Sequence, residues 1–99
     1  MRVISKKALD EFAKKHPDAK APFARWYGIV KKANFLNLNE VRQVFPSADK
    51  VSNCTVFNIG GNKYRLITAI HYNRQIIYIR FVLTHTEYDL NYWTGECAK

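Results

Sequence analysis

A chain of 99 residues with 47% hydrophobic content has room for one domain with a single core, which we expect residues 1–99 to form. No apolar run is long enough to span a bilayer and no charged-then-apolar leader is visible, so we expect a soluble, cytoplasmic protein without a membrane partner. The 16 lysines and arginines outnumber the 8 aspartates and glutamates, and a formal net charge of +8 makes polyanions the expected partners.

Cys54 and Cys97 are the two cysteines, and they lie far apart without the C-x-x-C spacing of a zinc or redox site. In a reducing cytoplasm we favour free thiols over a structural disulfide. We expect Cys97 to be an ordinary thiol rather than a nucleophile and assign neither cysteine a role.

The first residues predict a strand and a helix. Arg2–Ile4 is a short run that we expect to join the sheet at its edge. Ser5 is a typical N-cap, and the helix that follows should end at Lys15, because the residue before Pro17 is pushed out of the helical region. The apolar residues of this helix form one buried stripe: Ala8, Leu9, Phe12 and Ala13.

A second helix is predicted from about Ala19 to Ala33, with Asp18 as its N-cap. Since only a short proline-containing turn separates it from the first helix, the two should form an αα-hairpin. Core packing explains its aromatic stripe better than base stacking does: Phe23, Trp26, Tyr27 and Val30. A linker at Asn34–Leu38 leads to a short helical turn at Glu40–Val44, with Asn39 at its start. A loop or irregular strand at Ser47–Asn53 then connects to the sheet.

A three-stranded antiparallel meander is the centre of the predicted fold. The strands are Val56–Ile59, Lys63–Tyr72 and Gln75–Leu83, all rich in β-branched and aromatic residues. Gly60-Gly61 and Asn73-Arg74 are the connections, and both are short enough to act as two-residue hairpin loops.

The two short loops predict the register. Asn73-Arg74 should place Tyr72 opposite Gln75, and Gly60-Gly61 should place Phe57 opposite Tyr64 and Asn58 opposite Lys63. The apolar face then contains the pairs Ile70–Ile77, Thr68–Ile79, Leu66–Phe81 and Tyr64–Leu83. The second face contains His71–Ile76, Ala69–Tyr78, Ile67–Arg80 and Arg65–Val82, which gathers cations and a phenol.

The C-terminal segment should begin with one helical turn. Thr84 is predicted to cap it, with Glu87 placed as in a capping box and with His85 and Tyr88 on the turn. Residues 91–99 look loosely held, with Trp93 as their only strong anchor. The predicted fold class is α+β: an N-terminal helical hairpin packed on one face of a mainly antiparallel sheet, whose other face is open.

Three stretches of the second half carry a family resemblance. They are the N-x-G-G-N-x-x-R run formed by Asn58, Gly60, Gly61, Asn62 and Arg65, the strand arginine Arg80, and the T-H-x-E-Y-D run from Thr84 to Asp89. With the preceding helix pair, they resemble the HigB-type toxins of the RelE superfamily over nearly the whole chain. The resemblance implies a metal-independent endoribonuclease that needs no cofactor, cleaves mRNA, usually in the ribosomal A site, and is inhibited by an antitoxin.

The residues themselves suit RNA cleavage. RNA supplies its own nucleophile, the 2′-hydroxyl, so the protein needs a proton acceptor, cations for the charge on phosphorus and an acid for the leaving oxygen. Arg65 and Arg80 on one face could clamp a phosphate, and Lys63 extends the positive track. Tyr78 either stacks on a base or merely packs, and Asn58 on the same face is a further candidate RNA contact.

His85 is the best candidate for proton transfer, because histidine changes its charge near neutral pH and His85 follows the strand of Arg80. The plain alternative is a capping or surface histidine. Tyr88, three positions later, either positions the substrate or anchors the turn. His71 is a candidate RNA contact at the periphery of this face, and His16 is expected to be structural or solvated. Glu87 and Asp89 are expected to cap and solvate, although a carboxylate near His85 could orient it.

A partner protein follows from the resemblance, and other functions are left open. The expected antitoxin is a helix-turn-helix DNA-binding protein, so operator DNA would be contacted only through the antitoxin complex, while mRNA and the ribosome are the direct targets. The alternative is a non-catalytic RNA- or ribosome-binding module that uses the same basic face. A DNA-binding role is disfavoured, because no helix carries the basic and polar residues of a major-groove reader.

Overall fold

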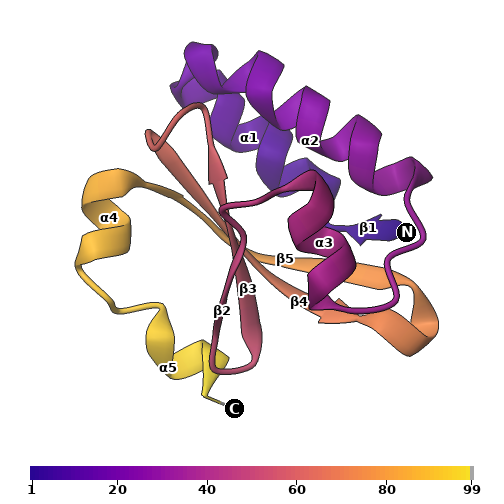
Figure 1. Ribbon diagram of the computed structural model, residues 1–99. Helices are drawn as coiled ribbons and strands as arrows, with labels where there is room; N and C mark the ends of the chain where they lie inside the picture. Colours follow the sequence, from indigo (N-terminus) through magenta and orange to yellow (C-terminus); the bar gives the residue numbers. More distant parts are fainter. Residues whose placement is uncertain (99) are drawn as a thin grey trace.

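The structure, a computed structural model, describes residues 1–98 and contains one sheet with helices on both of its faces (Figure 1). The elements in chain order are β1 (Arg2–Ile4), α1 (Lys6–Lys15), the 3-10 turn η1 (Pro17–Ala19), α2 (Lys20–Lys32), α3 (Leu38–Val44), β2 (Asp49–Val51), β3 (Cys54–Ile59), β4 (Tyr64–His71), the 3-10 turn η2 (Tyr72–Arg74), β5 (Ile76–Thr84), α4 (His85–Asp89) and α5 (Thr94–Cys97). No helix within this part of the chain is both long and apolar enough to cross a membrane.

The predicted α+β class and the meander are confirmed. The sheet has the order β1-β5-β4-β3-β2, and its strand pairs are antiparallel except for β1, which pairs with β5 in parallel. Figure 1 shows α1 and α2 lying together over one side of the sheet, away from α4 and α5. The predicted edge strand at the N-terminus and the helical hairpin therefore both form.

The helices bury part of each predicted stripe: Leu9 of α1 is buried, and Ala8, Phe12, Ala13 and Tyr27 are half-buried. Ser5 stands at the N-cap of α1 without a side-chain capping hydrogen bond, and two other predicted caps differ. Phe23, Trp26 and Val30 of α2 are buried against the sheet. Asp18 does not cap α2, because it lies within η1 and its carboxylate binds side chains of the sheet instead. Helix α3 starts at Leu38 rather than after Asn39, because the side chain of Asn37 caps it by accepting a hydrogen bond from the amide of Glu40.

The loop between β3 and β4 is longer than predicted. Ile59 pairs with Tyr64, and Asn58 pairs with Arg65, so the expected partners Tyr64 for Phe57 and Lys63 for Asn58 are wrong. Three consecutive residues adopt positive φ angles, 65° at Gly60, 58° at Gly61 and 72° at Asn62, and this left-handed run extends the loop by two residues. Because side chains alternate with a period of two, this shift leaves the residues of β3 and β4 on their predicted faces.

A β-bulge at Arg80 changes the second half of the β4–β5 register. The pairs Ile70–Ile77 and Thr68–Ile79 form as predicted, but the register then slips by one residue between Thr68 and Ile67, which leaves Arg80 without a partner. The predicted pairs Leu66–Phe81, Tyr64–Leu83, Ile67–Arg80 and Arg65–Val82 are therefore wrong, and the observed pairs are Ile67–Phe81, Leu66–Val82, Arg65–Leu83 and Tyr64–Thr84. Phe81 consequently packs in a second cluster and not under α1 and α2.

That second cluster covers the face that was expected to be open. It is formed by Cys54, Val56, Ile67, Leu83, Trp93 and Cys97. Cys54 and Cys97 form a disulfide, with their Cα atoms 5.2 Å apart, so the prediction of two free thiols is wrong. The prediction of a loosely held tail is wrong for residues 91–98. Trp93 and Cys97 are both buried, and the amide of Asn53 donates a hydrogen bond to the carbonyl of Cys97.

Candidate active site

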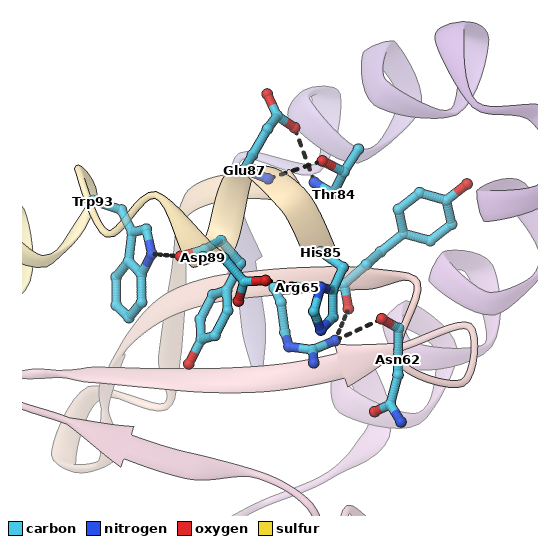
Figure 2. A network of polar contacts seen from close by, with 9 residues as sticks. Asn62, Arg65, Thr84, His85, Glu87, Asp89 and Trp93 are labelled. Atoms are coloured by element: carbon cyan, nitrogen blue, oxygen red, sulfur yellow. Dashed lines mark hydrogen bonds and ion pairs between the residues drawn. The ribbon is translucent and has the colours of Figure 1, made fainter.

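A capping box starts α4 as the sequence predicts. The hydroxyl of Thr84 accepts a hydrogen bond from the amide of Glu87 at 3.2 Å, and the carboxylate of Glu87 accepts one from the amide of Thr84 at 2.9 Å. These reciprocal bonds satisfy two backbone donors that a helix start leaves unpaired. Glu87 is thus occupied in capping, and His85 takes the first position of a fixed helical turn directly after β5 (Figure 2).

Arg65 lies beneath this turn and is only 8% exposed. Its Nη1 atom donates to the carbonyls of Asn62 at 3.0 Å and Tyr64 at 3.2 Å, and its guanidinium carbon lies 5.2 Å from the centre of the Tyr88 ring. A guanidinium carries five N–H groups, so the two carbonyl bonds leave those on Nε and Nη2 for a ligand. The geometry fits a cation that is fixed in advance for phosphate binding.

His85 is fixed at its backbone and at one ring nitrogen. Its amide donates to the carbonyl of Lys63 at 2.9 Å, and its Nδ1 lies 3.1 Å from a carboxylate oxygen of Asp89. With the Nδ1 proton directed to that carboxylate, Nε2 becomes the free acceptor of the ring. The side chain is 52% exposed, so a substrate can reach it. Asp89 therefore orients His85 and does not merely solvate the turn.

Tyr88 joins the turn to the C-terminal segment. Its ring stacks on Trp93 with the ring centres 4.9 Å apart, and its carbonyl accepts a hydrogen bond from the indole nitrogen at 2.9 Å. The opposite neighbour of the ring is the Arg65 guanidinium. The structure thus brings Arg65, His85 and Tyr88 together as the sequence predicts, with Tyr88 as a packing support for Arg65.

Arg80, Tyr78 and His71 lie toward the other end of the sheet and do not join this cluster. The bulge leaves Arg80 exposed between two surface hollows, one of about 350 Å³ that it lines with His71, and one of about 560 Å³ that it lines with Lys14 and Lys15. His71 packs edge-on against Tyr78 with the ring centres 5.2 Å apart. The Arg65 guanidinium hydrogen-bonds to the carbonyls of Asn62 and Tyr64, whereas Arg80 lies at the bulge, so a phosphate clamp formed by the two arginines stays a prediction.

Lys63 and Asn58 lie at the β3–β4 loop, next to the cluster. The ammonium of Lys63 forms an ion pair with Asp18 at 3.0 Å. Asn58 donates from its side chain to that of Asn62 at 3.4 Å. His16 stacks on Phe12 with the ring centres 4.4 Å apart, which agrees with its predicted structural role.

Asp18 is the residue near the site that the sequence did not indicate. Its carboxylate accepts hydrogen bonds from the phenol of Tyr64 and the ammonium of Lys63, and these bonds, the first above all, lower the pKa of Asp18 from its ordinary value of 3.8. The same contact raises the pKa of the Tyr64 phenol. Asp18 and Tyr64 lie 46 positions apart in the sequence, and only the packing of η1 against the sheet brings them together.

The lowered pKa of Asp18 predicts a pH-dependent contribution to stability. A carboxylate whose pKa is lower in the folded state stabilises the fold above the unfolded pKa and loses this effect as pH falls through the folded pKa. We expect Asp18→Asn to lower the free energy of unfolding at pH 7, and the difference from wild type to shrink as the pH falls below the ordinary carboxyl pKa of 3.8, as measured by urea denaturation. A difference that stays constant with pH would contradict a role for the charge.

Comparison with known proteins identifies relatives that span nearly the whole chain. Residues 19–91 match the HigB toxin family, described as the RelE-like toxic component of a toxin-antitoxin system. The mRNA interferase toxin HigB of Escherichia coli K12 is 36% identical over 90% of this chain and 88% of its own length. The mRNA interferase HigB of Shigella flexneri matches equally well, and that of Escherichia coli O6:H1 is 29% identical over 90% of this chain and 89% of its own length.

Proposed function

Because this chain belongs to the HigB family of RelE-like toxins, we propose that it is the toxin of a toxin-antitoxin system and that it cleaves mRNA. The observation that carries the proposal is the cluster of a buried arginine, an exposed histidine and its carboxylate partner at the end of β5. These are the groups that cleavage by the RNA's own 2′-hydroxyl requires.

In the proposed reaction His85 accepts the proton of the 2′-hydroxyl at Nε2. The 2′-oxygen then bonds to phosphorus while the bond from phosphorus to the 5′-oxygen breaks. The leaving 5′-oxygen takes a proton from solvent water, and the imidazolium at His85 afterwards returns its proton to solvent. Asp89 stabilises that imidazolium through its contact with Nδ1. Arg65 donates hydrogen bonds to the phosphate oxygens as negative charge develops on them, with Tyr88 supporting its guanidinium from the other side.

We assign the remaining predicted residues to RNA binding. Arg80, exposed at the bulge, is proposed to contact an RNA phosphate away from the scissile bond, with His71 and Tyr78 beside it. Lys63 and Asn58 are proposed to contact the RNA next to the cluster, since both belong to the β3–β4 hairpin. Such contacts mainly change affinity and its salt dependence, whereas His85 and Arg65 change the chemical step.

The partners are proposed from the family. The toxin acts on mRNA, which we propose it meets on the translating ribosome, and a cognate antitoxin inhibits it. We propose that this antitoxin is a helix-turn-helix protein and that the complex reaches operator DNA through it.

Expression of the chain without its antitoxin is expected to arrest growth by depleting translated mRNA, and the double variant Arg65→Ala, Arg80→Ala should be harmless. The readouts are colony formation and the amount of full-length mRNA after induction. The matched control is Lys31→Ala, Lys32→Ala, which removes the same charge from the last turn of α2 and should stay toxic. Equal toxicity of a double arginine variant that thermal unfolding shows to be folded would exclude the arginines from the mechanism.

A further inference from the structure

Asp18, in the turn between α1 and α2, contacts the start of β4, the strand that carries Arg65. One of its carboxylate oxygens accepts a hydrogen bond from the phenol of Tyr64, and the other pairs with the ammonium of Lys63 at 3.0 Å. Tyr64 itself is 5% exposed, and its ring packs against Phe12 and Phe23 at centre distances of 5.4 and 5.9 Å. The phenol is thus held by the core, and Asp18 joins η1 to the end of the β3–β4 loop.

The same stretch of backbone holds both groups of the candidate site. The carbonyl of Lys63 accepts a hydrogen bond from the amide of His85. The carbonyls of Asn62 and Tyr64 each accept a hydrogen bond from Nη1 of Arg65. Three consecutive carbonyls, at positions 62–64, therefore position the proposed base and the proposed phosphate ligand. Any shift of this segment moves both side chains.

The loop has few internal restraints on its conformation. It begins with Gly60 and Gly61, both at positive φ, and glycine loses more conformational freedom on folding than any other residue. The side chain of Asn62 accepts a long hydrogen bond of 3.4 Å from that of Asn58. The backbone of the loop has a hydrogen bond of 3.4 Å from the amide of Lys63 to the carbonyl of Gly60, besides those that its carbonyls accept from Arg65 and His85. Asp18, which binds the side chains of Lys63 and Tyr64, adds an anchor at the far end of the loop.

We propose that Asp18 is a positioning residue for RNA cleavage, which acts through Tyr64 and Lys63 to keep the 62–64 carbonyls in place beneath Arg65 and His85. The inference rests on the proposed function and adds to it a residue that lies on the helical hairpin, outside the cluster. Misplacing a reacting group by about 1 Å can cost roughly 100-fold in rate. We therefore expect the loss in the rate of the chemical step and not in RNA binding.

The test compares Asp18→Ala, Tyr64→Phe and the double variant with wild type in single-turnover cleavage of mRNA on ribosomes. Each single variant should lower the rate at saturating substrate by about 10- to 100-fold, and the half-saturating concentration should stay within about twofold. The double variant should be no slower than the slower single one, because both changes remove the same bond. Asp18→Asn, which keeps an acceptor for the phenol, should recover part of the rate. The matched control is Asp10→Ala, an exposed carboxylate of α1 that pairs with Lys6 and should leave the rate unchanged.

A second measurement separates this inference from the proposed function. The NMR shift of the His85 amide proton reports its bond to the Lys63 carbonyl, and it should move in Asp18→Ala and Tyr64→Phe but not in Asp10→Ala, even if the wild-type protein cleaves no RNA. Unchanged shifts and rates in a folded Asp18→Ala variant would overturn the inference. A lower half-saturating concentration at an unchanged rate would also overturn it, because Asp18 would then only screen Lys63 from RNA.

Discussion

His85→Ala is expected to slow single-turnover cleavage by about 10²–10⁴-fold, the usual contribution of a positioned acid–base group. The imidazole is exposed, and Asp89 holds its Nδ1, which leaves Nε2 for the 2′-hydroxyl. Because the side chain is half-exposed and its Nδ1 contact is with the exposed Asp89, the fold and the binding of RNA should persist. Asp89→Asn should give a smaller loss in rate, since it weakens the orientation of the ring without removing the base.

The matched control is His71→Ala, an exposed histidine on the other end of β4. It should cleave at nearly the wild-type rate at saturating substrate and bind RNA more weakly. Binding of each variant to the same programmed ribosomes must be measured beside the rate. If bound His85→Ala cleaves as fast as wild type, the base lies elsewhere, and Tyr88 and Lys63 are the next side chains to replace.

Cys97→Ser is expected to lower the free energy of unfolding by about 4 kcal/mol, the loop-entropy value for a disulfide that closes a loop of this length. The bridge joins residues 43 positions apart, and both cysteines are buried in the second cluster. A loss of this size is a large share of the roughly 5–15 kcal/mol that stabilises a typical domain. Urea denaturation of the wild type and the variant measures it.

Two controls tie that loss to the bridge itself. Cys54→Ser should be as destabilising as Cys97→Ser, and the double variant should be little worse than either, because each change removes the same bond. A strong dithiol reductant should destabilise the wild type and leave the variants unaffected. A wild type that is no more stable than Cys97→Ser would show that the two sulfurs are not joined in solution.

The second cluster also supports the site, which makes the disulfide more than a distant crosslink. Trp93 is buried between the bridged segment and Tyr88, and the Tyr88 ring lies against Arg65. The order of contacts runs from Cys97 through Trp93 and Tyr88 to the guanidinium. The face that the sequence pattern left open is therefore covered where it supports Arg65 and accessible where His85 lies.

Local signals in the sequence were sufficient for the elements and for part of the site. The capping box of Thr84 and Glu87 and the helix stop at Pro17 each depend on residues within one turn, so residue type and spacing determine them. Alternation along the strands assigned Arg65 to the face of His85 correctly even though the loop length was wrong, because a shift of two residues preserves the face.

Features that join distant parts of the chain were decided only by the tertiary structure. The bulge at Arg80 shifts the register by one residue and moves Phe81 to the other face, and neither loop shows this in its own sequence. The bonds of Asp18 to Tyr64 and of Cys54 to Cys97 span 46 and 43 residues, and each exists because η1 or the C-terminal segment packs on the sheet. A sequence shows which side chains can form such contacts, but their partners depend on how the helices and the sheet pack, which no local spacing encodes.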